Sequence, residues 1–319
     1  KWQLPGRAPT LVHDCGFDEY RMWAYEHNLP EGVRHTGSYE DANRRQTSRY
    51  WHPSLMENGR YLETRPEQYG PDLFNEFVID FVRRNRERPF CVYYTSPLTH
   101  GPHVETPDPQ RPGGRLPNGF QTNLEYLDHL MGRLVRAVDE MGLADRTVFL
   151  FVGDNGTARN GKGTVTELGA RVPFLVRCPG TVQSGVVSRE LTDITDLFPT
   201  LLEFAGVRPP KGHPLDGKSL VAHLRGRRER HRPWIFSYLG AGRILRDQRW
   251  LLELPGDGTE RLYDCGERRD GIGYHLVPPG SSEDSRRARR RFGELLERLP
   301  GPEGQPGLVQ PGSAAGGRE

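Results

Sequence analysis

The sequence predicts an α/β fold in which helices sandwich a mostly parallel or mixed sheet, with a small antiparallel sheet plus one helix at the C-terminal end. Three observations lead to this prediction. Apolar runs of strand length recur along the chain, amphipathic helices separate them, and after about residue 230 the pattern changes to several short strands. Strands that alternate with crossover helices are typical of parallel sheets covered on both faces.

Three stretches carry apolar residues at the i, i+3, i+4 spacing of an amphipathic helix. They run from Pro71 to Arg84, from about residue 120 to 141, and from Asp193 to Phe204. Gly142 and Gly206 follow the last two stretches, and a glycine just past the last periodic residue commonly ends a helix. We therefore expect three helices that pack against the sheet.

Short apolar segments rich in strand-forming residues predict the strands of this sheet: 89–94, 147–152 and 173–177. His100 follows the first segment, and the pair Asp154-Asn155 follows the second. Ligands of parallel sheets bind at the carboxyl ends of the strands. These side chains are therefore expected to line one crevice.

We expect one large domain over residues 1–230 and a small C-terminal α+β subdomain over residues 231–299. Short apolar runs such as 234–238 predict an antiparallel sheet in the second part, and residues 283–298 predict a helix that packs on it. Residues 300–319 are rich in glycine and proline, and they are expected to form a disordered tail.

Composition argues against several classes of function. With 44 Lys+Arg against 42 Asp+Glu, the net charge of +2 predicts neither nucleic-acid binding nor attraction to a membrane surface. No apolar run approaches the ~18–20 residues that a membrane span needs. The four cysteines are isolated and show no CxxC or other metal-ligand spacing.

The most informative segment covers residues 147–180 and reads TVFLFVGDNGTARNGKGTVTELGARVPFLVRCPG. Asp154 and Asn155 end an apolar run and offer carboxylate and amide oxygens, which suit a hard cation. Lys162 lies between two glycines and is one of only four lysines, so a compact point charge is indicated there rather than the planar fork of arginine. A tight turn would explain Asp-Asn-Gly alone, but it does not explain the GKGT and GARVPF that follow.

This order of motifs resembles the signature of the sulfatase family, which reads DNG, a loop, GKGT and R-V-P-F. The resemblance continues in Lys1-Trp2-Gln3-Leu4, in GFDEY at 16–20, in the T-H-x-P segment around His100, and in TDITDLFPTLLEFAGVRPP at 192–210. It spans roughly residues 1–265. The implied fold is that of the alkaline phosphatase superfamily.

The resemblance also implies a reaction, the hydrolysis of an organic sulfate ester carried by a small molecule or a glycan. Asp154 and Asn155 would hold Ca²⁺, Lys162 and Lys1 would contact the sulfuryl oxygens, and Gln3 would lie among the substrate-binding residues. His100 would hold a proton for the leaving oxygen, a role typically worth about 10²–10⁴-fold in rate. The family's nucleophile is a formylglycine, made from the Cys or Ser of a C-x-P-x-R or S-x-P-x-R segment.

Two departures from the family pattern affect this expectation. Gln3 stands where the family has histidine, and a glutamine can hydrogen-bond but cannot act as an acid. The sequence contains no C-x-P-x-R or S-x-P-x-R segment and lacks the family's early paired aspartates. We therefore expect a chain without the family's N-terminal part, inactive as it stands. The family suggests a periplasmic or secreted location, but the sequence carries no signal region that would decide it.

Two alternatives stay open. A phosphate or phosphonate monoester hydrolase of the same superfamily would present similar lysines and a metal, because tetrahedral oxyanions resemble one another. A zinc phosphatase would show more His and Asp ligands than the pair Asp154-Asn155. The other alternative is a non-catalytic remnant that binds oxyanions.

Overall fold

The computed structural model describes residues 11–24, 31, 48–158, 160–209, 211–212, 214–227 and 229–299. Contacts between Cα atoms divide the chain into two compact units, Lys1–Thr147 and Val148–Glu319. The expected disordered tail at 300–319 lies outside the described residues. The domain boundary near residue 230 stays a prediction.

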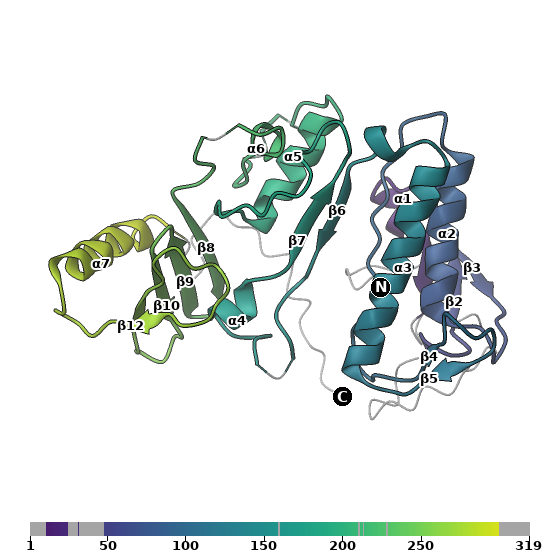
Figure 1. Cartoon of the computed structure of the whole chain (residues 1–319), viewed down its shortest axis with the longest axis horizontal. Helices are drawn as coiled ribbons and strands as arrows, with labels where there is room; N and C mark the ends of the chain where they lie inside the picture. The colour runs from purple at the N-terminus through teal and green to yellow at the C-terminus, as the bar shows by residue number, and fades with distance from the viewer. Residues whose placement is uncertain are drawn as a thin grey trace. The chain divides into compact units, whose positions relative to one another are not determined.

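The first unit contains small antiparallel sheets and two long helices. Its elements are α1 (Leu11–Asp14), β1 (Arg21–Trp23), β2 (Leu55–Glu57), β3 (Arg60–Leu62), α2 (Gly70–Arg84), β4 (Thr106–Pro107), β5 (Arg115–Leu116) and α3 (Phe120–Glu140). The strands β1, β2 and β3 pair in this order, and β4 pairs with β5. The helices α2 and α3 lie side by side (Figure 1).

Both long helices form where the apolar spacing predicts them. Pro71 occupies the first turn of α2, where the missing N–H had no helical partner to lose. The Asn75 amide of α2 donates to the carbonyl oxygen of Leu130 in α3 at 3.0 Å. Gly142 ends α3 with a φ of 69°, a conformation that glycine adopts without steric cost. No helix in the described part of the chain is long and apolar enough to span a membrane.

The predicted strand at 89–94 is wrong. These residues pair with no other strand among the described residues, and the Tyr93 side chain is 72% exposed. The composition of the segment favours an extended backbone, but a strand also needs a neighbour to accept and donate its hydrogen bonds. Composition carries no information on that neighbour.

The second unit begins with the strand pair that frames the central motif. The short 3-10 helix η2 (Ala144–Arg146) still belongs to the first unit. The elements of the second unit are β6 (Phe149–Val152), α4 (Glu167–Ala170), β7 (Phe174–Arg177), η3 (Ile194–Asp196), α5 (Leu197–Phe204), α6 (Val221–Leu224), β8 (Trp234–Leu239), β9 (Gly242–Asp247), β10 (Trp250–Leu254), β11 (Arg261–Asp264), β12 (His275–Leu276) and α7 (Glu283–Leu296). The third predicted helix corresponds to η3 followed by α5.

The strands β6 and β7 pair antiparallel, with Phe149 opposite Arg177 and Val152 opposite Phe174. The alternation of strands and helices favours mostly parallel pairs, yet every strand pair among the described residues is antiparallel. The reason at β6 and β7 is the connection between them. It contains only the four-residue helix α4 and doubles back as a loop, so it makes no crossover.

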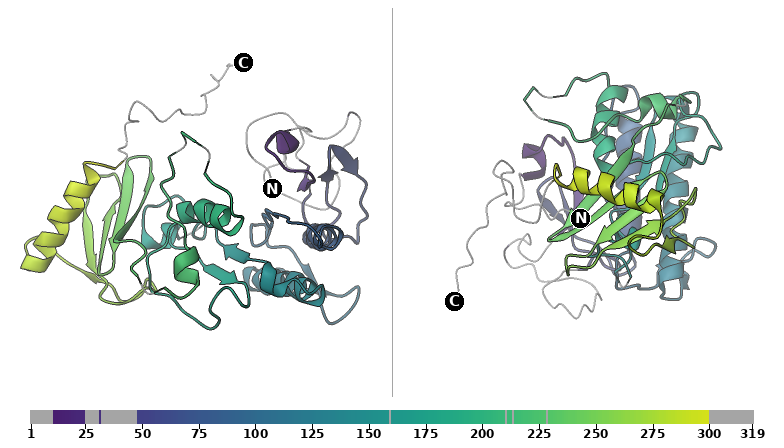
Figure 2. Two further views of the ribbon diagram at one scale, coloured as in Figure 1. Left: turned by 90° about the horizontal axis from the view of Figure 1, so that it is seen from above. Right: turned by 90° about the vertical axis from the view of Figure 1, so that its left-hand side faces the viewer.

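The C-terminal sheet and its helix confirm the prediction. Five antiparallel strands follow the order β12-β11-β10-β9-β8, and α7 packs on the sheet (Figure 2). The buried residues between α7 and the sheet form one cluster: Leu245, Trp250, Leu252, Leu262, Ala288 and Phe292. Ser282 starts α7 by accepting the Ser285 N–H at 3.1 Å, and the Ser285 hydroxyl accepts the Ser282 N–H in return.

Candidate active site

The loop between β6 and β7 carries three of the predicted site residues. Asp154 and Asn155 come directly after β6, and both side chains are exposed. The Asn155 N–H and side-chain amide donate to Asp154 Oδ1 at 2.9 and 3.2 Å, and the same amide nitrogen is 3.2 Å from the Gly156 carbonyl oxygen. Within the described residues this leaves Asp154 Oδ2 and Asn155 Oδ1 without hydrogen bonds.

These two oxygens fit part of a calcium site. A carboxylate and an amide oxygen are the donors that Ca²⁺ prefers, but the ion takes about 6–8 of them. The part of the chain that the structure describes contains no group of three or more His, Cys, Asp or Glu able to hold a metal. The chemistry of the pair therefore suits calcium, while the described residues supply only two of the ligands.

Three glycines explain why the loop after Asn155 has its particular sequence. A Cβ added at Gly156 would lie 1.8 Å from the carbonyl oxygen of Leu168, and one at Gly161 would lie 2.0 Å from the same atom. A Cβ at Gly169 would lie 2.3 Å from the Thr164 carbonyl oxygen. At these positions backbone packs directly on backbone, which only glycine allows. The glycines of the DNG, GKGT and ELGA motifs thus shape the loop.

Lys162 lies on this glycine-packed loop, which we call the Lys162 loop and define as residues 156–169. Its N–H donates to the Thr157 carbonyl oxygen at 2.9 Å, as does that of Gly161. The Lys162 side chain is exposed, and its ammonium forms no ion pair with any described residue. The charge is therefore available to an anionic ligand. The structure thus brings Asp154, Asn155 and Lys162 together on one connection between two paired strands.

His100 belongs to the first unit, and its surroundings include a residue that the sequence does not single out. The Nη2 of Arg49 is 3.0 Å from His100 Nδ1 and also donates to the Gly101 carbonyl oxygen. Arg49 is only 2% exposed, and its guanidinium lies 4.8 Å from the ring centre of Trp23. Because 51 positions separate Arg49 from His100, only the fold reveals that they are neighbours.

A second buried side chain holds the backbone at His100. Burial raises the pKa of the Tyr50 phenol to about 12, so the hydroxyl is protonated at neutral pH. It donates to the carbonyl oxygen of His100. The Tyr50 side chain is fully buried, which fixes this part of the T-H-x-P segment against the core of its unit.

The imidazole of His100 lies between a donor and an acceptor. Its Nδ1 is 3.0 Å from Arg49 Nη2, and a guanidinium can only donate. The same Nδ1 is 2.7 Å from the Gly101 carbonyl oxygen, which can only accept. Nδ1 can therefore accept from Arg49 when it carries no proton and donate to Gly101 when it carries one.

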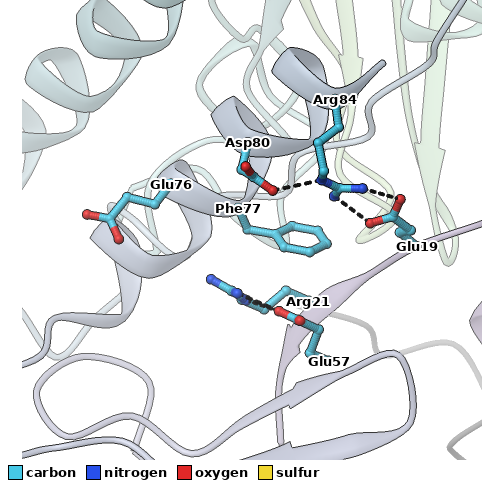
Figure 3. A pocket seen from close by; sticks show the side chains of 7 residues that line it. All are labelled: Glu19, Arg21, Glu57, Glu76, Phe77, Asp80 and Arg84. Carbon is cyan, nitrogen blue, oxygen red and sulfur yellow. Dashed lines mark hydrogen bonds and ion pairs between the residues drawn. The ribbon is translucent and has the colours of Figure 1, made fainter.

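The remaining predicted site residues, Lys1 and Gln3, lie outside the described residues. The structure does contain a cavity of about 480 Å³ in the first unit, shown in Figure 3 and lined by Glu19, Arg21, Glu57, Glu76, Phe77, Asp80 and Arg84. Four carboxylates face two guanidinium groups, which leaves a net negative lining. Arg84 pairs with Glu19 and Asp80, and Arg21 pairs with Glu57. Such a lining repels a sulfate, so this cavity is not the predicted site.

Asp196 is the most strongly engaged carboxylate of the second unit. Its oxygens accept from His231 Nε2 at 3.0 Å, from Arg232 Nε at 3.0 Å and from the Lys218 N–H at 2.7 Å. Burial alone would raise the pKa of Asp196, but these hydrogen bonds together hold it below its ordinary value. The Asp196 side chain is fully buried, and both carboxylate oxygens accept hydrogen bonds from these neighbours. Its role is therefore structural.

The sequence matches one family model and several known proteins. A family model described as Sulfatase matches residues 14–207. Steryl-sulfatase of Mus musculus is 35% identical over 208 residues, which are 58% of this chain and 32% of that protein. N-acetylgalactosamine-6-sulfatase of Homo sapiens is 31% identical over 261 residues, which are 75% of this chain and 48% of that protein. The chain thus spans about a third to a half of the length of these relatives.

Solved structures support the predicted fold class. The crystal structure of Ps i-CgsB in complex with k-i-k-neocarrahexaose has a TM-score of 0.67 at 20% identity and covers 93% of this chain and 70% of its own. The structure of BT4656 in complex with its substrate D-glucosamine-2-N,6-O-disulfate has a TM-score of 0.66 at 16% identity and covers 89% and 76%. At these identities the likeness shows the fold alone. The fold is the alkaline-phosphatase-like α/β class that the sequence predicts.

Proposed function

This chain belongs to the sulfatase family, and we propose that it forms part of an enzyme that hydrolyses an organic sulfate ester. The observation that carries the proposal is the Lys162 loop. A loop whose glycines impose backbone-to-backbone packing presents an exposed ammonium. The same connection presents two adjacent oxygen donors that suit a hard cation.

In this proposal Asp154 and Asn155 are ligands of Ca²⁺, and Lys162 contacts the sulfuryl oxygens. A calcium ion held there would supply Lewis-acid stabilisation of the sulfuryl group, whose negative charge grows during the reaction. Lys162 acts on the same charge from a preorganised position, which is the usual source of large electrostatic effects in catalysis. The contact pattern supports this role because the loop is held by its own backbone and the lysine side chain stays available.

His100 is proposed to act on the leaving oxygen of the same ester. In this role the charged ring gives up the proton on Nε2, while Nδ1 lies next to Arg49 Nη2 and the Gly101 carbonyl oxygen. Arg49 and Tyr50 position the ring and its backbone. Lys1 is proposed as a second sulfuryl contact and Gln3 as a substrate-binding residue, both outside the described residues.

The nucleophile is proposed to be the family's formylglycine, which would supply a hydrated aldehyde for attack on sulfur. No C-x-P-x-R or S-x-P-x-R segment occurs in the 319 residues, so we propose that this chain alone is inactive. The substrate is proposed to be a sulfate ester of a small molecule or a glycan. Support for a sugar comes from relatives, since one acts on N-acetylgalactosamine 6-sulfate by its name and another structure contains a glucosamine disulfate.

The test is an assay of two purified proteins on an aryl sulfate with calcium. One is this chain, and the other is the chain preceded by its genomic upstream sequence and co-expressed with a formylglycine-generating enzyme. We expect activity only in the longer protein, and we expect Asp154→Ala to raise its calcium requirement. Cleavage of an aryl phosphate but not of the sulfate would replace this proposal with the phosphoesterase alternative. Calcium-independent binding of inorganic sulfate without turnover of either ester would favour an oxyanion-binding remnant.

A further inference from the structure

The C-terminal sheet holds the Lys162 loop through an apolar contact. Val165, three residues after Lys162, is buried and packs against Ile244, Leu251 and Cys265 of the sheet region. Gly242 provides the room, because a Cβ there would lie 2.6 Å from a Val165 methyl group. This contact lies on the strand faces that carry Ile244 and Leu251. The cluster beneath α7 instead contains their chain neighbours Leu245 and Leu252.

A buried polar cluster adds a second attachment two residues further on. The Glu167 carboxylate accepts from Arg246 Nη1 at 3.2 Å and from the Tyr274 hydroxyl at 3.1 Å. The Glu167 N–H donates to the Glu253 carboxylate at 3.0 Å. Arg246 and Glu253 are only 4% and 5% exposed. Arg246 Nη2 donates to the Arg268 carbonyl oxygen at 2.8 Å. Both Nη atoms of the guanidinium therefore have partners.

These contacts constrain the position of the Glu167 carboxylate more than they stabilise the folded protein. Replacing a whole buried ion pair by apolar residues often costs little. Here Arg246 Nη1 is shared between both Glu167 carboxylate oxygens, and the Tyr274 hydroxyl donates to one of them, so the position of the carboxylate is narrowly defined. Glu167 is the first residue of α4, and α4 contains the Leu168 and Gly169 backbone against which the loop glycines pack. Displacement of Glu167 therefore displaces the support under Gly161 and, with it, Lys162.

We propose that Arg246, together with Tyr274, is a positioning residue of the active site: by holding Glu167, the C-terminal sheet sets the position of Lys162. The sheet thus contributes to the active site indirectly, through the position of Lys162. The mechanical part of this inference stands on the contacts alone. Its consequence for catalysis rests on the proposed function of Lys162.

Hydrogen exchange on this chain tests the mechanical part directly. In Arg246→Met we expect amides of the Lys162 loop to exchange about tenfold faster, while amides of α7 (286–296) keep their wild-type rates. The matched control is Arg249→Met, which removes a half-exposed arginine paired with Asp264 at 2.6 Å on the neighbouring strand. The control should leave the loop within about twofold of wild type. Unchanged loop exchange in Arg246→Met would overturn the proposal.

If Arg246→Met also accelerates exchange in α7, the substitution has loosened the whole sheet. Tyr274→Phe then tests whether the contacts of Glu167 alone hold the loop. This variant removes one hydroxyl from Glu167 and leaves the buried charges paired. We expect faster exchange in the loop alone, by about threefold, and no effect on the loop contradicts the proposal. Arg246→Lys should restore part of the protection, since it keeps the charge near Glu167 but loses the fork.

Turnover by the longer, formylglycine-containing protein separates the two claims. If both hold, Arg246→Met lowers kcat/KM for the aryl sulfate about tenfold or more, Arg246→Lys recovers part of it, and Arg249→Met changes it little. A looser loop with undiminished turnover would keep the positioning role of Arg246 and remove the proposed role of Lys162. An unchanged loop would contradict the positioning role whatever the turnover shows.

Discussion

The Lys162 loop and the C-terminal sheet are stabilised in opposite ways. The loop depends on glycines that let one stretch of backbone lie on another, whereas the sheet depends on large side chains buried beneath α7. The backbone packing leaves the Lys162 side chain exposed, although Val165 and Glu167 of the same loop contact the sheet. The sheet, in contrast, gains its stability from buried side chains. The difference predicts that substitutions in the two regions fail for different reasons.

The largest effect is expected for Phe292→Ala in α7. Phe292 is fully buried in the cluster with Leu245 and Leu262, and truncating a buried phenylalanine typically costs about 3–5 kcal/mol. Denaturant unfolding of the second unit should show this loss. A loss below about 1 kcal/mol would mean that α7 does not form the core that the contacts indicate.

A similar loss is expected for Arg232→Met, which leaves the Asp196 carboxylate buried without its main cation. Breaking a buried pair from one side costs roughly 3–5 kcal/mol. The pKa of Asp196 is lowered in the folded state, so its contribution to stability is present above its unfolded pKa of about 3.9 and is lost as the pH falls through the lower folded pKa. The free energy of unfolding should therefore differ less between wild type and Arg232→Met at pH 3 than at pH 7. An equal difference at the two pH values would contradict this expectation.

A smaller but more localised effect is expected for Gly161→Ala in the Lys162 loop. The added methyl group would meet the Leu168 carbonyl oxygen at 2.0 Å, and relieving such overpacking costs about 1–3 kcal/mol. Hydrogen exchange should speed up in the loop and stay unchanged in α7. Loop exchange equal to wild type would show that the backbone packing is not what holds Lys162.

The matched substitution in the other region is Gly293→Ala, and it should be the mildest. A Cβ at Gly293 meets no atom within 4 Å, and the residue lies inside α7. Alanine in a helix interior is favoured over glycine by about 0.5–1 kcal/mol. We expect a slight rise in unfolding free energy, and a clear loss of stability would contradict the account of this helix.

Local patterns predicted the elements whose formation depends on neighbouring residues. The helices α2 and α3 follow from apolar spacing, and the C-terminal sheet follows from short apolar runs with a helix after them. The strand at 89–94 was predicted wrongly because its formation depends on a partner that its own composition does not specify. Antiparallel pairing of β6 and β7 depends on a loop that doubles back, which the alternation of strands and helices does not reveal.

The residues of the candidate site were likewise predictable only where they lie close together in the sequence. Asp154, Asn155 and Lys162 could be predicted because they lie within nine positions of one another beside unusual glycines. Arg49 beside His100 and Arg246 beside Glu167 could not, because 51 and 79 positions separate the partners. Arginine is also the common cation of this chain, so neither residue stands out in the sequence.

The central claim is that Lys162 acts on a sulfate ester, and its most direct test compares two lysines. In the longer, formylglycine-containing protein, kcat/KM for an aryl sulfate would be measured for Lys162→Ala and for Lys211→Ala, an exposed lysine outside the loop. We expect a loss of about 10²–10³-fold for the first variant, as for other preorganised charge-stabilising groups, and little change for the second. Equal activity of the two variants would contradict it.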